Sequence, residues 1–193
     1  MHRDHFDSEF ARILLSDERR RWQDPDRIIS QLRIEKDFQI CDLGCGPGFF
    51  TLAFARKVGS KGKVFAVDSS PKMLEVLRAE LIKNRIRNVE LICSDVTSTG
   101  LPGNSMDIAF FANVLHDIDD KPAFLAEVRR ICKKEAQVVN IDWKKDQQSN
   151  HGPPDHMRLD EEEALKIFEK EGFRLERTID GGSYHYGLLF RVE

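Results

Sequence analysis

The chain has 193 residues, 40% of them hydrophobic, which predicts one domain with a substantial core and leaves no room for a second catalytic domain. Its formal charge is −3, with 30 Lys and Arg against 33 Asp and Glu, so it has no overall positive field that would bind a nucleic-acid backbone. The N-terminus lacks the apolar core of a signal peptide, and no stretch is long enough to span a membrane. We therefore expect a cytoplasmic protein whose partners include neither nucleic acid nor a membrane.

Strand and helix patterns alternate along the chain, which predicts an α/β fold with three layers around a mixed sheet. We expect one domain over residues 1–193, with a helical N-terminal extension (1–34), a core (35–145) and a final part (146–193) that holds a loop, the last helix and a closing hairpin. The expected strands are 38–41, 64–67, 89–93, 106–111 and 136–141, the expected helices are 49–58, 71–84, 122–133 and 160–171, and the hairpin strands are 173–178 and 184–192.

A glycine-rich run follows the first strand. It reads Asp42-Leu-Gly-Cys-Gly-Pro-Gly48 and precedes the first helix of the core. Glycine permits positive φ and lets a ligand lie against the main chain, and the start of the next helix offers unpaired N–H groups. The run therefore predicts a binding site for a cofactor.

Two further acids follow expected strands. Asp68 ends the second strand and lies 20 positions after Gly48, at the register where an acid accepts hydrogen bonds from both ribose hydroxyls. Asp95 follows the third strand, where it is able to accept a hydrogen bond from an adenine amine. Ligands bind outside the carboxyl ends of strands in open α/β sheets. The alternatives are that Asp42 only binds loop amides, that Asp68 caps a helix, and that Asp95 forms a turn.

The glycine spacing selects among nucleotide cofactors. The third glycine comes one residue earlier than in G-x-G-x-x-G, and Asp42 precedes the first. A carboxylate there repels a pyrophosphate and attracts an ammonium group near a sulfonium centre. The pattern thus favours S-adenosylmethionine, with S-adenosylhomocysteine as the product, over NAD or ATP.

With these motifs, residues 38–115 resemble the class I S-adenosylmethionine-dependent methyltransferases, in particular the small-molecule branch of the ubiquinone/menaquinone-biosynthesis type. The resemblance implies a Rossmann-like, doubly wound mixed sheet of about seven strands with the last antiparallel. It also implies that residues 35–145 form the cofactor-binding core. The cofactor-binding residues that we expect are Asp42, Gly44, Cys45, Gly46, Gly48, Asp68, Ser69, Asp95, Val96 and Asn113.

His116 is the candidate catalytic residue. It follows the Asn113-Val-Leu segment that the resemblance assigns to the region beneath the transferred methyl. Histidine is a suitable general base when the nucleophile must lose a proton, and simple packing is the alternative role.

Substrate-side candidates lie in a proline-containing loop and near the N-terminus. His151, His156 and Arg158 belong to the loop after the fifth strand, and Arg158 binds an anionic substrate group or pairs with Glu161 or Glu162. Trp22 covers the cofactor pocket or docks on the sheet edge. The neighbouring Arg19-Arg20-Arg21 run is expected to be a solvated helix face.

We expect the four cysteines, Cys41, Cys45, Cys93 and Cys132, to be reduced thiols, and we expect no metal site. The predicted function is transfer of a methyl group to a small molecule. The alternatives left open are a non-catalytic S-adenosylmethionine-binding module, a methyltransferase for protein or RNA, a NAD-dependent oxidoreductase and a thiol-rich metalloid methyltransferase. The sequence does not identify the acceptor, and it does not indicate an oligomer.

Overall fold

The fold centres on one seven-stranded sheet. The computed structural model describes residues 8–145 and 151–192, so the first seven residues of the expected extension, residues 146–150 of the expected loop and residue 193 lie outside the described residues. The strand order is β3-β2-β1-β4-β5-β7-β6. The strands are β1 (Gln39–Leu43), β2 (Lys63–Asp68), β3 (Val89–Cys93), β4 (Met106–Ala112), β5 (Cys132–Trp143), β6 (Arg174–Asp180) and β7 (His185–Arg191).

The pairing confirms the predicted doubly wound mixed sheet. Strands β1 to β5 pair in parallel, and β7 runs antiparallel to both of its neighbours, β5 and β6. The parallel strands β1, β2 and β4 are buried almost throughout, which explains why they appear in the sequence as nearly continuous apolar runs.

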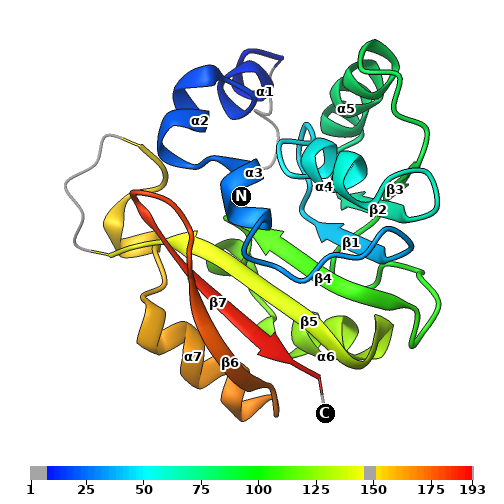
Figure 1. Cartoon of the computed structure of the whole chain (residues 1–193). Helices are drawn as coiled ribbons and strands as arrows, with labels where there is room; N and C mark the ends of the chain where they lie inside the picture. Colours follow the sequence, from blue (N-terminus) through cyan, green and yellow to red (C-terminus); the bar gives the residue numbers. More distant parts are fainter. Residues whose placement is uncertain (1–7, 146–150, 193) are drawn as a thin grey trace.

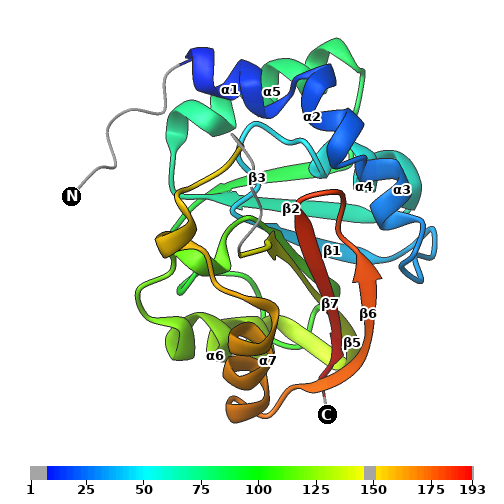
Figure 2. The ribbon, with the colours of Figure 1, turned by 90° about the vertical axis from the view of Figure 1, so that its left-hand side faces the viewer.

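Helices cover both faces of the sheet and make three layers, as predicted (Figures 1 and 2). One core contains side chains such as Ile28 and Phe54 from the face that carries the N-terminal helices, and another contains Phe124 and Phe168 from the opposite face. The helices are α1 (Ser8–Leu14), α2 (Asp17–Trp22), α3 (Pro25–Ile29), α4 (Thr51–Val58), α5 (Pro71–Lys83), α6 (Lys121–Ile131) and α7 (Glu161–Lys170), with short 3₁₀ turns η1 (Leu115–Asp117) and η2 (Asp155–Met157). None of those described is long and apolar enough to cross a bilayer.

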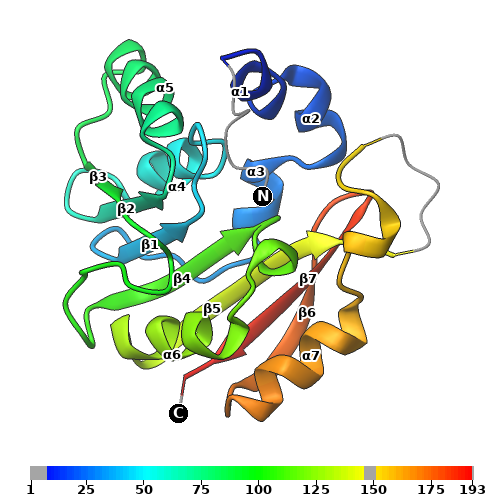
Figure 3. The ribbon, with the colours of Figure 1, turned by 180° about the vertical axis from the view of Figure 1, so that it is seen from behind.

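The order of the strands creates the place for a site. The chain moves outward from β1 to β2 and β3, and then returns to place β4 on the other side of β1. The connections after β1 and β4 therefore separate at the carboxyl ends of these two central strands, which is where open α/β sheets bind ligands. Figure 3 shows α4 and α5 on one side of this point and α6 and α7 on the other.

Local capping explains where two helices begin. The Ser70 side chain accepts a hydrogen bond from the Met73 amide at the start of α5, and Pro71 occupies its first position. Asp160 and Glu163 form the capping box that the sequence predicts at the start of α7. In contrast, α4 begins at Thr51, and its N-cap residue Phe50 makes no side-chain capping hydrogen bond.

The N-terminal helices are fixed to the far end of the chain. The Trp22 carbonyl accepts a 2.8 Å hydrogen bond from the Ser183 amide, and a Cβ on Gly182 would come within 2.3 Å of the same oxygen. The Trp22 ring stacks on His185 at 5.5 Å between centroids. This docking holds α2 against β7 at the edge of the site.

A buried carboxylate fixes the loop that follows Asp95. Glu127 on α6 is 7% exposed and accepts hydrogen bonds from the amide and hydroxyl of Thr99 at 2.8 and 2.6 Å, and from Arg130. The hydrogen bond from Arg130 lowers the pKa of Glu127 to about 2, and those from Thr99 add to the effect against the opposing effect of burial. Because this pKa lies below the ordinary value of 4.5, the stabilisation is complete above about pH 4.5 and is lost as the pH falls through about 2.

We expect Glu127→Gln to lower the free energy of unfolding at about pH 7, with a smaller difference from the wild type at about pH 3.5. Urea unfolding at both pH values measures this difference. Glu169→Gln, on an exposed position of α7, is the matched control and should change little. A Glu127→Gln effect that is equal at the two pH values would contradict the ionic origin of the stabilisation.

Candidate cofactor and methyl-transfer site

The glycine run forms a tight loop between β1 and α4. Gly44 and Gly48 have φ values of 68° and 96°, in the region that side chains rarely adopt. A Cβ on Gly44 would lie 2.5 Å from Val114, and one on Gly48 would lie 2.2 Å from Leu77. Glycine is therefore required both for the turn and for the close approach of neighbouring segments.

Asp42 lies at the end of β1 and is 3% exposed. Its Oδ2 accepts a 2.5 Å hydrogen bond from the Thr51 hydroxyl at the start of α4. Burial raises the pKa of Asp42 to about 7, and the bond from Thr51 only partly opposes this effect. A positively charged ligand group would restore the ionised form.

Asp68 joins the ends of β1 and β2. Its Oδ2 accepts from the Gly46 amide and its Oδ1 from the Ser70 amide, both at 2.8 Å. Burial raises the pKa of Asp68, and these two backbone bonds oppose that rise. Each oxygen keeps a further lone pair for a ligand, so the bracing of the loop and the binding of a hydroxyl are compatible.

Asp95, Val96 and Asn113 lie on the next strand ends. The Asp95 Oδ1 accepts from the Thr97 amide at 2.9 Å, which forms the turn after β3. Asn113 follows β4 with φ of 61°, and its backbone N–H donates to the Ile141 carbonyl at 2.8 Å. The Asn113 Oδ1 is buried and has no hydrogen-bond partner within the described part of the chain.

A cavity of about 1170 Å³ joins these groups. Predicted residues that line it are Asp42, Gly44, Cys45, Gly46, Asp68, Ser69, Asp95, Val96, Asn113 and His116. Gly48 is not in the lining, because it faces Leu77 of α5 instead. Its role is to shape the loop. Burial raises the pKa of the Cys45 thiol, so this cysteine contributes a compact neutral side chain to the loop.

His116 and Asp142 form a buried pair in the cavity wall. The Nδ1 of His116 lies 2.7 Å from Oδ1 of Asp142, whose oxygens also accept from the amides of His116 and Trp143. A carboxylate with these three donors keeps the Nδ1 proton in place and leaves Nε2 of the neutral ring as an acceptor, 3.5 Å from Oδ2 of Asp117. Burial by itself lowers the pKa of His116, but the hydrogen bond and charge of Asp142, with the charge of Asp117, outweigh it, so the pKa lies above 6.5.

The expected substrate-side residues are not in the cavity lining. Arg158 is buried and donates to the carbonyls of Lys144, His151 and Pro153, so it fixes its own loop and does not pair with Glu161 or Glu162. The loop reaches the cavity through Gly152, Pro153, Pro154 and Met157 instead.

Trp22 and His151 belong to an aromatic cluster beside the cavity, and His156 is exposed on η2. Trp22 packs on Trp143, Tyr184, His151 and His185. Of the two roles considered for Trp22, the structure favours docking. Trp143 is the member of this cluster that lines the cavity.

Sequence reasoning missed Arg19 and Asp142. Arg19 is 7% exposed and lines the cavity, so the arginine run is not wholly a solvated face. Helical periodicity identifies Arg19 as the buried member of the arginine run only when the face by which α2 docks is known. Asp142 ends an apolar strand, as Asp42 and Asp68 do, and this recurring pattern was the available signal.

Comparisons with known proteins agree with this geometry. Residues 34–172 match the family described as a methyltransferase domain. The ubiquinone/menaquinone biosynthesis C-methyltransferase of Burkholderia vietnamiensis is 32% identical over 117 residues, which are 61% of this chain and 48% of that protein. The chain thus spans about half the length of the curated relatives it matches.

Solved structures extend the similarity to the whole fold. A SAM-dependent methyltransferase from Aquifex aeolicus has a TM-score of 0.91 and 30% identity, covering 97% of this chain and 100% of the other. Geranyl diphosphate C-methyltransferase from Streptomyces coelicolor, solved with S-adenosyl-L-homocysteine, has a TM-score of 0.71 at 15% identity, covering 88% of this chain and 79% of the other. At that identity the second likeness concerns the fold alone.

We expect Asp142→Asn to lower the pKa of His116, because the amide removes the negative charge that favours the imidazolium. An NMR titration of the imidazole resonances measures this pKa directly. Glu169→Gln, at the exposed position of α7, serves as the control and should leave the His116 titration unchanged. An unchanged His116 titration in a folded Asp142→Asn protein would contradict the pairing.

Proposed function

Given that the chain belongs to the class I S-adenosylmethionine-dependent methyltransferases, we propose that it moves a methyl group to a small-molecule acceptor by in-line displacement. One observation carries the proposal: His116, which is paired with the buried Asp142, lines the same cavity as the glycine loop and the three acids. A proton acceptor and a cofactor-type loop within one cavity suit a transfer in which the nucleophile loses a proton.

The residues present fit the cofactor. Gly44 and Gly46 line the cavity, and the unpartnered Asn113 Oδ1 is able to accept a hydrogen bond from a ligand. In the proposal, Asp42 holds the ammonium group, Asp68 the two ribose hydroxyls, and Asp95 with Val96 the adenine side, while Cys45 and Ser69 complete the wall. When bound, S-adenosylmethionine supplies an electrophilic methyl group on a sulfonium.

The cavity supports a small acceptor. Ligand pockets are typically about 300–1,000 Å³, so a cavity of about 1170 Å³ has room for a second small molecule beside the cofactor. Around His116, the lining includes Ile118, Pro154 and Met157, with the carboxylates of Asp117 and Asp119 at the same side. This environment favours a largely apolar acceptor without an anionic group near the reacting atom.

The proposed chemistry of the protein is proton removal and positioning. Nε2 of His116 accepts the proton from a carbon acid or hydroxyl, and the Asp142 carboxylate stabilises the imidazolium that forms. A carbon acceptor agrees with the C-methyltransferase activity named for the Burkholderia relative. Orienting two molecules in one cavity and excluding water supply the rest of the rate enhancement.

Release of S-adenosylhomocysteine from S-adenosylmethionine tests the proposal, with a panel of small phenols and enolisable carbonyl compounds as acceptors. We expect release that depends on the added small molecule. Binding of the cofactor without release for any member of the panel would favour a non-catalytic module, and methyl transfer to RNA or protein from a cell extract would favour a macromolecular acceptor.

We expect Asp68→Ala to weaken S-adenosylhomocysteine binding more than Asp95→Ala does. Asp68 makes two charge-assisted hydrogen bonds to the ribose in this account, whereas Asp95 makes one to the adenine. At about 1.5 to 3 kcal/mol for each bond, losing two corresponds to roughly a hundredfold to ten-thousandfold loss of affinity. Calorimetry on the two folded variants measures the difference, and a larger loss for Asp95→Ala would contradict the assignment.

We expect His116→Ala to lower turnover by about a hundredfold or more while cofactor affinity stays within about threefold. The wild-type rate should rise with pH through the pKa of His116, which lies above 6.5, because only the neutral ring accepts a proton. An unchanged rate in a stable His116→Ala protein would reject the general-base role, and a joint loss of stability and cofactor binding would assign the residue to packing.

A further inference from the structure

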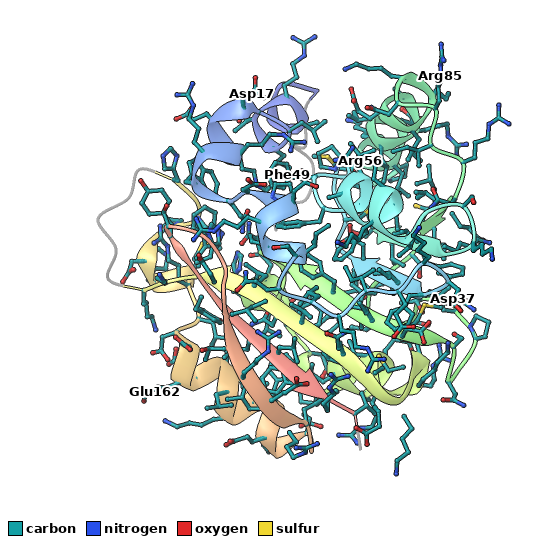
Figure 4. The ribbon with its side chains drawn as sticks, viewed as in Figure 1. Asp17, Asp37, Phe49, Arg56, Arg85 and Glu162 are labelled. Atoms are coloured by element: carbon teal, nitrogen blue, oxygen red, sulfur yellow. The ribbon has the colours of Figure 1, made fainter. Side chains whose placement is uncertain are left out.

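Arg19 is a buried cation in the wall of the candidate cofactor cavity. It comes from α2, and its guanidinium carbon lies 4.1 Å from the centre of the Phe49 ring. Phe49, labelled in Figure 4, lies beneath the N-terminal helices at the start of α4. Helix α2 is docked on the fold through Trp22, and this docking fixes the position of Arg19.

The hydrogen bonds of Arg19 go to neutral groups. Its Nε and Nη2 donate to the Gln23 side chain at 3.1 and 2.9 Å, and its Nη1 donates to the Leu14 carbonyl at 3.0 Å. A guanidinium has five N–H donors, so two remain. Among the described residues, no carboxylate forms an ion pair with this side chain; Asp42 acts on it only through its charge.

A buried cation without a direct counterion is costly unless an anion arrives. Burial accordingly lowers the pKa of Arg19 to about 9, and the charge of Asp42 compensates only in part. The remaining charged residues of the lining are mostly acids, namely Asp42, Asp68, Asp95, Asp117 and Asp119. The other lysine or arginine of the lining, Lys72, is exposed at the start of α5.

Arg19 and Asp42 together are complementary in charge to a zwitterionic ligand. The amino-acid portion of S-adenosylmethionine carries an ammonium and a carboxylate on one carbon atom, so its receptor needs an acid and a base that are close together. Asp42 supplies the acid from the end of β1, and Arg19 supplies the base from the helix above the glycine loop, where Leu14 and Gly46 also approach each other.

We propose that Arg19 binds the carboxylate of the amino-acid portion of the cofactor with its two remaining N–H donors. The inference rests on the proposed function, because it requires the cofactor to occupy the loop beside Asp42. It assigns a cofactor-binding role to the N-terminal helices, which therefore complete the site and do more than cover the sheet. Arg19 also gives the site a means to distinguish the cofactor from adenosine derivatives that lack the carboxylate.

The test compares S-adenosylhomocysteine with its decarboxylated analogue, which keeps the ammonium and lacks the carboxylate. Isothermal calorimetry gives both affinities for the wild type, Arg19→Met, Arg19→Lys and the control Arg20→Met. Arg20 lies on the same helix with its guanidinium carbon 5.4 Å from the Phe49 ring, but it does not line the cavity.

We expect Arg19→Met to weaken binding of S-adenosylhomocysteine at least tenfold and to change binding of the analogue by less than about threefold. Arg19→Lys keeps the charge but loses the planar fork, so it should show a smaller selective loss. Arg20→Met should change neither affinity by more than about threefold. Should Arg19→Met fail to fold, the test is whether Arg19→Lys loses more affinity for S-adenosylhomocysteine than for the analogue.

Equal losses for the two ligands would overturn the inference and assign Arg19 to packing, since a structural defect does not distinguish them. Unchanged affinities in Arg19→Met would overturn it as well. These results differ from a failure of the proposed function, in which the wild type itself binds neither ligand and the inference falls with it.

Discussion

The carboxylate of Asp68 joins the two strand ends on which the site is built. Through its bonds to Gly46 and Ser70 it fixes the glycine loop of one βα unit to the start of the helix in the next. The loop has three glycines at positive φ, residues with high backbone freedom in the unfolded chain, and these bonds help to fix it. The open main chain, the acids and the start of α4 are all placed relative to this connection.

Around this connection the protein buries charges that are only partly balanced. Burial raises the pKa of Asp42 to about 7 and lowers that of Arg19 to about 9, so each group is shifted toward its neutral form. Both shifts are relieved by a ligand with one charge of each sign. In contrast, Nδ1 of His116 is already paired with Asp142, and its Nε2 lies 3.5 Å from the exposed carboxylate of Asp117. The partly unbalanced charges of Asp42 and Arg19 suit the binding of a ligand, and the His116 and Asp142 pair suits proton transfer.

Local sequence signals were sufficient for much of the fold. Ser70 with Pro71 and Asp160 with Glu163 predicted helix starts, and the apolar runs before Asp42 and Asp68 predicted buried parallel strands. These features depend on residues near one another in the chain, where backbone geometry and capping act directly. The number of strands and the antiparallel direction of the last strand came from the family resemblance, because pairing between distant strands has no local signal.

The site was predictable only where the residues follow strand ends. Arg19 and Asp142 were missed because their roles depend on contacts across the fold. Helix α2 must dock on His185 before Arg19 reaches the cavity, and β5 must lie beside β4 before Asp142 reaches His116. The opposite error concerned Arg158, whose charge suggested ligand binding. Its donors are consumed by three carbonyls of its own loop, a use that composition does not reveal.

The central claim is that the glycine loop with its acids receives S-adenosylmethionine and excludes dinucleotides. Calorimetric titration of the wild-type protein with S-adenosylhomocysteine, NAD and ATP tests it most directly. The account predicts saturable binding of S-adenosylhomocysteine and none of NAD or ATP, since Asp42 favours an ammonium and repels phosphate. Clear binding of NAD together with no response to S-adenosylhomocysteine would contradict it.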